Sequence, residues 1–93
     1  DKAEYTYRLG RILQKMNELD QAISLYERTI TLSNQTDWSF GATASLQLGY
    51  IYLAKNQPQK AKQYFQKALL YHKHEYKTSV DNKARAALNK MGS

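Results

Sequence analysis

Few residues in this 93-residue chain could do chemistry, and they are scattered. The two histidines, His72 and His74, lie next to Glu75, and such a group is a possible start for a transition-metal site. On a helix, however, positions i and i+2 diverge, which favours solvent-facing side chains at a helix end. The serines have no histidine base in a recognisable setting, the acidic residues are mostly isolated, and the glycines form no phosphate-binding loop. The sequence therefore predicts no enzyme, no metal site and no cofactor.

Basic side chains are concentrated in the second part of the chain. The net charge is +6, but residues 1–54 carry five basic and six acidic side chains, or −1, whereas residues 55–93 carry nine and two, or +7. Such asymmetry admits nucleic acid, an anionic membrane or an acidic protein as a partner. It is also typical of a plain solvated face, which the sequence favours.

One pattern supports nucleic acid as a partner. Tyrosines alternate with lysines in the basic part, which suits base stacking combined with phosphate contacts. Tyr64, however, falls on the apolar stripe of its predicted helix, and no known nucleic-acid module pattern is present. A basic nucleic-acid-binding surface on the fourth and fifth helices therefore remains an alternative function. Its residues would be Tyr64, Tyr71 and Tyr76 with Lys60, Lys67, Lys73 and Lys77.

Length and composition limit the remaining classes. Ninety-three residues make one small domain with a thin core, and the absence of cysteine excludes disulfides and thiolate catalysis. The longest apolar run, residues 48–54, is far shorter than a membrane span, and no signal peptide opens the chain. Because the first residue is Asp1, we expect a piece of a longer protein. A cytoplasmic location is favoured, and the compartment of the parent protein stays open.

Apolar spacing predicts helices along the whole chain. A first helix over residues 4–16 would place four apolar side chains on one face, and Asp20 would cap a second helix after a short turn. Two helices joined by so few residues must form an antiparallel hairpin. The predicted core faces are Leu9, Ile12, Leu13 and Met16 on the first helix, and Leu19, Ala22, Ile23, Tyr26 and Ile30 on the second.

A third helix should begin near Thr36 or Asp37, run to about Lys55, and be apolar on two faces, as expected for a central buried helix. A fourth helix should start at Pro58, where a first-turn proline is tolerated, and run to about Tyr71. A fifth should cover residues 77–91. The predicted buried residues are Ala61, Tyr64, Phe65, Ala68 and Leu69 on the fourth helix and Val80, Ala84, Ala87, Leu88 and Met91 on the fifth.

An internal repeat organises these helices. Gly10 and Gly49 are 39 residues apart, and so are the pairs Ala22–Ala61 and Tyr26–Phe65. Glycine inside an apolar helix costs about 1 kcal/mol relative to alanine, so its repetition indicates a close helix–helix contact.

The spacing Leu-Gly-x-x-Tyr, then Ala-x-x-x-Phe and a later alanine, resembles the tetratricopeptide repeat. The second copy carries it as Leu48, Gly49, Tyr52, Ala61, Phe65 and Ala68. The first copy keeps Leu9, Gly10 and Ala22, with Leu13 and Tyr26 as substitutes and Thr29 in place of the last alanine. The period is about five residues longer than the usual one. Residues 74–88 are also similar to the end of some bacterial tetratricopeptide proteins.

The resemblance implies an all-α, alpha-alpha superhelix over residues 1–93. It would contain two helical hairpins, with repeat one at 3–36 and repeat two at 37–75, followed by a C-terminal capping helix at 77–91, about five helices in all. It also implies a non-catalytic scaffold whose concave groove binds a peptide or a helix of a protein partner. The groove residues would be Tyr7, Arg11, Gln14 and Lys15 from the first helix and Leu46, Tyr50 and Leu53 from the third.

Two questions about this groove remain open from the sequence. The apolar trio of Leu46, Tyr50 and Leu53 could face the groove or lie under the fifth helix. The carboxylate clamp of chaperone-binding relatives is not intact, because Tyr7 and Arg11 occupy first-helix positions and Gln47 replaces an asparagine. Self-association through an uncovered end helix is a further alternative, which would make the chain a homo-oligomer.

Overall fold

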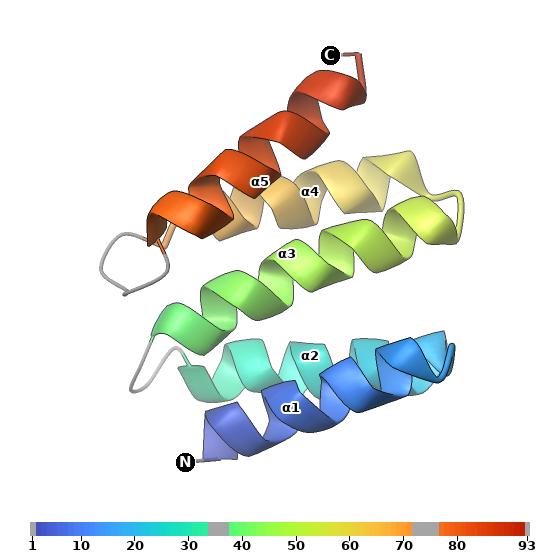
Figure 1. Ribbon diagram of the computed structural model, residues 1–93, viewed down its shortest axis with the longest axis vertical. Coiled ribbons are helices and arrows are strands. Elements are labelled where there is room, and N and C mark those ends of the chain that lie inside the picture. Colours follow the sequence, from blue (N-terminus) through green and yellow to red (C-terminus); the bar gives the residue numbers. More distant parts are fainter. Residues whose placement is uncertain (1, 34–37, 72–76, 93) are drawn as a thin grey trace.

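The computed structural model describes residues 2–33, 38–71 and 77–92 and forms five α-helices over them. Figure 1 shows two layers, with α1, α3 and α5 in front of the fainter α2 and α4. No strand occurs in these three ranges, and the all-α helical-repeat prediction is confirmed. The helices are α1 (Lys2–Lys15), α2 (Leu19–Ser33), α3 (Trp38–Ala54), α4 (Pro58–Leu69) and α5 (Lys77–Lys90).

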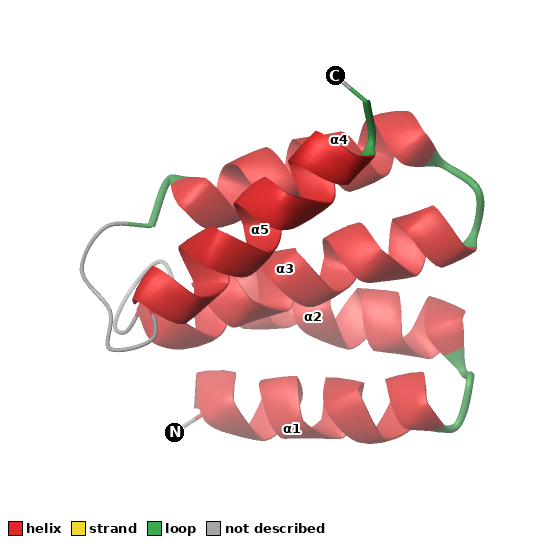
Figure 2. Cartoon of the chain, turned by 45° about the horizontal axis from the view of Figure 1, so that its top comes forward, coloured by secondary structure: helices red, strands yellow, loops and turns green. Residues whose placement is uncertain are grey.

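Helix α3 is the centre of the molecule. It contacts each of the other four helices, and the chain is arranged as hairpin α1–α2, hairpin α3–α4 and then α5 (Figure 2). Small and large side chains are buried around its circumference, which confirms the prediction of a central buried helix. They include Ala42, Ala44, Ser45, Leu46, Leu48, Ile51 and Tyr52.

The two hairpin turns have the same construction. Asn17 and Asn56 adopt left-handed φ angles of 63° and 61°. After α1, the amide of Glu18 donates to the carbonyl of Leu13 at 2.9 Å, and after α3 the amide of Gln57 donates to the carbonyl of Tyr52 at 2.8 Å. This hydrogen-bonding pattern ends a helix and satisfies its last carbonyls. The two asparagines are 39 residues apart, so the turns repeat with the helices.

The repeated glycines bring each pair of helices into close contact, as predicted. A Cβ atom on Gly10 would lie 2.8 Å from the ring of Tyr26, and one on Gly49 would lie 2.5 Å from the ring of Phe65. Both rings are fully buried. Each hairpin is therefore built around one glycine of its first helix and one aromatic residue of its second.

Thr29, which replaces the alanine expected there, is also fully buried. Its hydroxyl lies 2.7 Å from that of Thr6 and donates to the carbonyl of Leu25 at 2.8 Å. The Thr6 hydroxyl also lies 3.1 Å from the carbonyl of Ala3, so both buried hydroxyls have hydrogen-bond partners, which matters because buried polar groups without partners are costly. In the first hairpin, a hydrogen-bonded threonine pair therefore takes the place of the apolar contact that an alanine at position 29 would make.

The prediction for the buried face of α1 is wrong in part. Ile12 and Met16 are 54% and 63% exposed, whereas Ala3, Thr6 and Gly10 are buried. Helix α1 contacts α2 and α3, and no helix of the described chain covers Ile12 and Met16. Asp20 does not cap α2, which begins at Leu19. Instead its carboxylate accepts a bond from the Lys55 amino group at 2.9 Å.

The last two helices follow the predictions closely. Pro58 occupies the first turn of α4, and Ala61, Phe65 and Ala68 are buried. Val80 and Ala84 of α5 are buried, while Ala87, Leu88 and Met91 pack partly against the core. Gly92 has a left-handed φ of 74° just after α5. The predicted starts of the third helix at Thr36 or Asp37 lie outside the described residues.

Candidate partner-binding groove

The first helices of the two hairpins and α5 line one face of the molecule. Helix α5 packs on α4 and α3 much as α3 packs on α2 and α1, so α1, α3 and α5 follow one another across this face (Figure 1). Two pockets open along it, one between all three helices and one between α3, α4 and α5. We call the first the α1–α3 pocket, the second the α3–α5 pocket, and the two together the groove.

The α1–α3 pocket, of about 400 Å³, brings three of the predicted site residues together. Tyr7 and Arg11 come from α1 and Leu46 from α3. Leu46 is only 3% exposed, so it contributes to the pocket floor. The full lining is Glu4, Tyr7, Arg8, Arg11, Phe40, Thr43, Leu46, Gln47, Ser79, Val80 and Lys83.

Tyr7 is held in this pocket by its neighbours. Its ring lies 5.8 Å from those of Tyr26 and Phe40, measured between centroids. The guanidinium of Arg11 donates to the Tyr7 hydroxyl at 3.3 Å, and this hydrogen bond is the main reason that the pKa of Arg11 is raised. Both side chains are therefore held in place before any partner binds, and Arg11 brings a positive charge to the pocket lining.

The α1–α3 pocket is net positive. Glu4, its acidic residue, is paired with Arg8 at 2.5 Å. Among the described residues the other ion pair joins Lys55 to Asp20, so neither Arg11 nor Lys83 has an acidic partner there. An anionic group entering this pocket would meet two cations that no carboxylate of the described chain neutralises.

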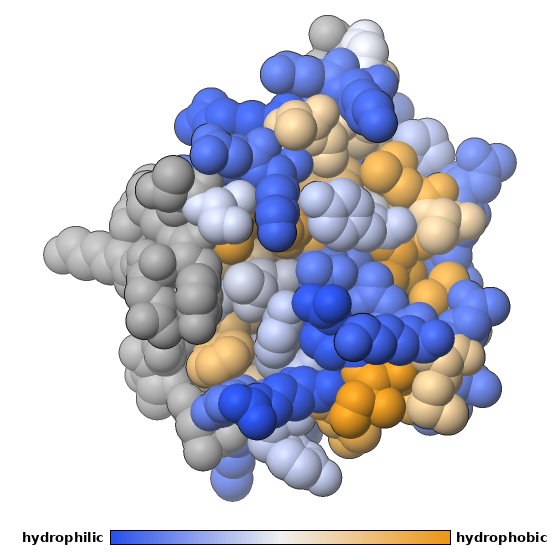
Figure 3. Space-filling view, in the orientation of Figure 1, coloured by the Kyte–Doolittle hydropathy of each residue, from blue (hydrophilic) through white to orange (hydrophobic). Residues whose placement is uncertain are grey.

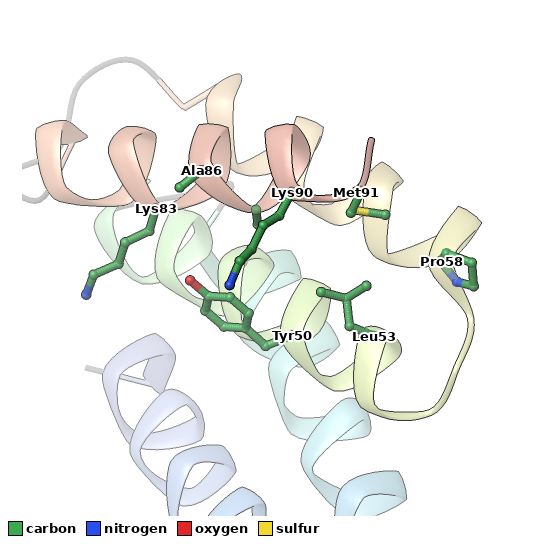
Figure 4. A pocket seen from close by; sticks show the side chains of 8 residues that line it. Tyr50, Leu53, Pro58, Lys83, Ala86, Lys90 and Met91 are labelled. Carbon is green, nitrogen blue, oxygen red and sulfur yellow. The ribbon is translucent and has the colours of Figure 1, made fainter. Parts of the chain in front are cut away.

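The α3–α5 pocket, of about 920 Å³, contains the other two predicted apolar residues. Tyr50 packs edge-on against Phe65, with ring centroids 5.4 Å apart, and partial burial raises the pKa of its phenol. Leu53 is 39% exposed at the pocket edge. Figure 4 shows the end of Lys90 beside the Tyr50 ring, whereas Lys83 extends from α5 away from Tyr50 and Lys90. The lining is Tyr50, Leu53, Pro58, Lys83, Ala86, Ala87, Lys90 and Met91.

Helix α5 answers the question left open about the apolar trio of α3. Leu46 is covered, whereas Tyr50 and Leu53 line a pocket whose opposite wall is α5. The remaining two predicted site residues line neither pocket. Gln14 accepts a hydrogen bond from the Tyr26 hydroxyl at 2.6 Å, and Lys15 is exposed at the end of α1.

Sequence reasoning missed the residues that α5 contributes. Lys83 and Lys90 stand seven positions apart, which places them on the same face of a helix two turns apart. That spacing was a visible signal for a pair of cations with a common direction. Phe40 was also missed, because its ring gains a role only when Tyr7 of another helix lies beside it.

A family model for the tetratricopeptide repeat matches residues 1–69 of the chain. The chain belongs to the tetratricopeptide repeat family. The match spans α1 to α4 and ends before α5, whose likeness to bacterial tetratricopeptide proteins stays a prediction. No curated protein and no solved structure gives a significant match. Tetratricopeptide repeats in general are non-catalytic modules that mediate protein–protein interactions, so protein is the class of partner to expect.

On the opposite layer, this tetratricopeptide protein uses its tyrosines for packing. Tyr64 stacks on Tyr52 with centroids 5.5 Å apart and donates to the carboxylate of Glu27. The amino group of Lys60 lies 5.1 Å from the centre of the Tyr52 ring. Tyr71 is buried, and its ring lies against Gly41. Tyr52 therefore covers one face of the Tyr64 ring and Tyr71 is buried in the core, while Tyr76 lies outside the described residues.

No cluster of histidine, cysteine and acidic side chains suited to a metal occurs in residues 2–33, 38–71 and 77–92. His72, His74 and Glu75 lie outside those ranges. Within them, every helix is too short or too polar to cross a bilayer.

Proposed function

We propose that this chain is a non-catalytic interaction module that captures a peptide or a helix in the groove formed by α1, α3 and α5. The observation that carries the proposal is the grouping of predicted site residues. Tyr7, Arg11 and Leu46 line one pocket, and Tyr50 and Leu53 line the next pocket along α3. A partner lying along α3 could contact both.

The chemistry of the two pockets supports a protein partner. Their volumes, about 400 and 920 Å³, suit side chains of a bound segment. Aromatic and aliphatic groups form the walls, and Arg11, Lys83 and Lys90 stand at the edges. A mixture of rigid aromatic anchors and flanking charges is typical of residues that dominate the binding energy of protein interfaces.

The proposal can be tested with peptides selected from a phage-displayed random library against the immobilised chain. Binding of a selected peptide to the isotope-labelled protein should shift amide resonances of α1, α3 and α5 in nuclear magnetic resonance spectra. Shifts confined to the outer faces of α2 and α4, or no selected binder at all, would contradict groove capture.

Matched variants sharpen this test. Tyr50→Ala and Arg11→Glu should each weaken peptide binding by about tenfold or more, as expected for an anchor residue. Tyr5→Ala and Arg28→Glu make the same changes at exposed positions outside both pockets and should leave affinity unchanged. Thermal melts must show that each variant folds. Equal binding by all four variants would refute the site.

A second candidate function is self-association through α1. Tyr5, Ile12 and Met16 are 69%, 54% and 63% exposed, and they recur on one side of the helix. The residue 39 positions after Ile12 is Ile51 of α3, which is buried. Figure 3 shows apolar surface over α1 bordered by hydrophilic side chains. This α1 stripe is the face that a neighbouring hairpin would cover in a longer array.

Sedimentation velocity over a wide concentration range tests the second candidate. Self-association should appear as a concentration-dependent sedimentation coefficient that Ile12→Lys abolishes and Arg28→Glu does not. A monomer at all concentrations would remove self-association and leave groove capture untouched.

A further inference from the structure

The charged residues of the α3–α5 pocket are of one sign. Lys83 and Lys90 are its only lining residues that carry a charge at neutral pH, and the other side chains are Tyr50 and five apolar residues. The apolar residues are Leu53, Pro58, Ala86, Ala87 and Met91. The pocket is thus an apolar depression with a cation at each of two places along one wall.

Lys83 and Lys90 stand two helical turns apart on the same side of α5. Seven helical residues separate them by about 10.5 Å along the axis of α5, and the end of Lys90 lies beside Tyr50 while Lys83 extends away from it (Figure 4). Ala86, Ala87 and Met91 lie between or beside them, and Tyr50 and Leu53 form the opposite wall. A partner lying along α5 therefore meets Lys83 first, then Lys90 beside the Tyr50 ring, and then the apolar residues Leu53, Met91 and Pro58 (Figure 4).

We propose, building on the groove function above, that the α3–α5 pocket binds an acidic amphipathic helix. Its two carboxylates stand at positions i and i+7 and pair with Lys83 and Lys90, because that spacing repeats the axial separation of the lysines. Apolar side chains at i+3 and i+4 lie between the carboxylates and enter the pocket against Ala86, Ala87 and Tyr50. Side-chain carboxylates make these contacts, so the partner does not need a free chain terminus.

Nucleic acid fits this pocket less well, although it is also anionic. Two lysines supply little of the repeated phosphate contact that drives nucleic-acid binding, and an apolar floor offers phosphates nothing. Electrostatic pairing at exposed lysines instead steers the partner and sets its orientation, while apolar contacts give most of the affinity.

The experiment is a displayed library of helical peptides of fixed scaffold, N-acetylated and C-amidated when resynthesised. Leucine or phenylalanine is allowed at i+3 and i+4, and Glu, Gln or Lys at i and i+7. The proposal expects enrichment of Glu at both positions, with the Gln peptide binding about tenfold more weakly, as for two exposed ion pairs. The double variant Lys83→Glu/Lys90→Glu should reverse the preference to Lys.

The control is the double variant Arg28→Glu/Arg85→Glu, which makes the same change in net charge at exposed residues outside the pocket and should retain the preference for Glu. Equal enrichment of Glu and Gln would overturn the acidic-partner proposal but leave groove capture standing. If neither this library nor the random one yields a binder, groove capture fails and this proposal fails with it. The acidic-helix proposal would also be overturned if a single-stranded oligonucleotide bound more tightly than the Glu peptide and Lys83→Glu/Lys90→Glu abolished that binding.

Discussion

A Cβ atom on Gly49 would lie 2.5 Å from Cε1 of Phe65, well inside van der Waals contact. Phe65 is fully buried, so its ring cannot move aside cheaply. We expect Gly49→Ala to lower the free energy of unfolding by about 1–2 kcal/mol, because overpacking outweighs the gain in helix propensity of about 1 kcal/mol. Urea denaturation measures the change. Gly49→Ala with Phe65→Leu should cost less than the sum of the two single changes, and a more stable Gly49→Ala would contradict the close-contact role.

The left-handed turn residues offer a test of backbone strain. Asn56 has a φ of 61°, which alanine adopts at a cost of about 1 kcal/mol and glycine adopts freely. Asn56→Ala should therefore lower the denaturation midpoint, and Asn56→Gly should leave it unchanged or raise it slightly. The same pair of changes at Asn17 serves as an internal replicate, since its φ is 63°. Equal effects of alanine and glycine would contradict the assigned conformation.

The buried hydroxyl pair should show energetic coupling. Thr6 and Thr29 are 2.7 Å apart between α1 and α2, and Thr29 also bonds to the carbonyl of Leu25. In a double-mutant cycle with Thr6→Val and Thr29→Val, the single changes should not add, with a coupling energy of about 0.5–1.5 kcal/mol. Additive single changes would show that the hydroxyls do not support each other.

Alkaline pH should destabilise the chain through its buried tyrosines. Burial raises the pKa of Tyr26, and burial together with the bond to Glu27 raises the pKa of Tyr64. A raised folded-state pKa means that the folded state holds the proton longer, so the stabilisation is complete below the ordinary tyrosine pKa of about 10 and is lost as pH rises above it. The free energy of unfolding should fall from about pH 10 upward.

Two variants check this origin. Tyr26→Phe should cost about 1 kcal/mol at neutral pH through the lost bond to Gln14, and it should flatten the alkaline decline. Tyr64→Phe should flatten it as well, through the loss of the proton held near Glu27. An unchanged slope in the double variant would assign alkaline unfolding to other groups.

The repeat was predictable from sequence because its parts are local and duplicated. Gly10 with Tyr26 and Gly49 with Phe65 form the same kind of contact in the two hairpins, so one repeated spacing predicted both hairpins. The exposure of Ile12 and Met16 was not predictable. Periodicity shows which face of a helix is apolar, but only the neighbouring helices decide whether that face is covered.

The division of the site into two pockets was also not predictable from the sequence. Leu46 and Tyr50 stand one turn apart on α3, and the sequence pattern placed both on the same apolar face. The position of α5 separates them, because Ser79 and Val80 line the pocket of Leu46 while Lys90 and Met91 line that of Tyr50. The path of α5 depends on packing against two other helices, which a one-dimensional pattern does not specify.

The contacts of α3 with all four other helices determine how the molecule comes apart. In a linear array, stability is a sum of each unit's own term and its interfaces with its neighbours. Helices α1 and α5 each stand at an end, so they can open locally while the rest persists. Amide hydrogens of α3 should then exchange with solvent only when the whole chain unfolds. The groove should be lost earlier, when an end helix opens locally, because two of its three walls are the end helices α1 and α5.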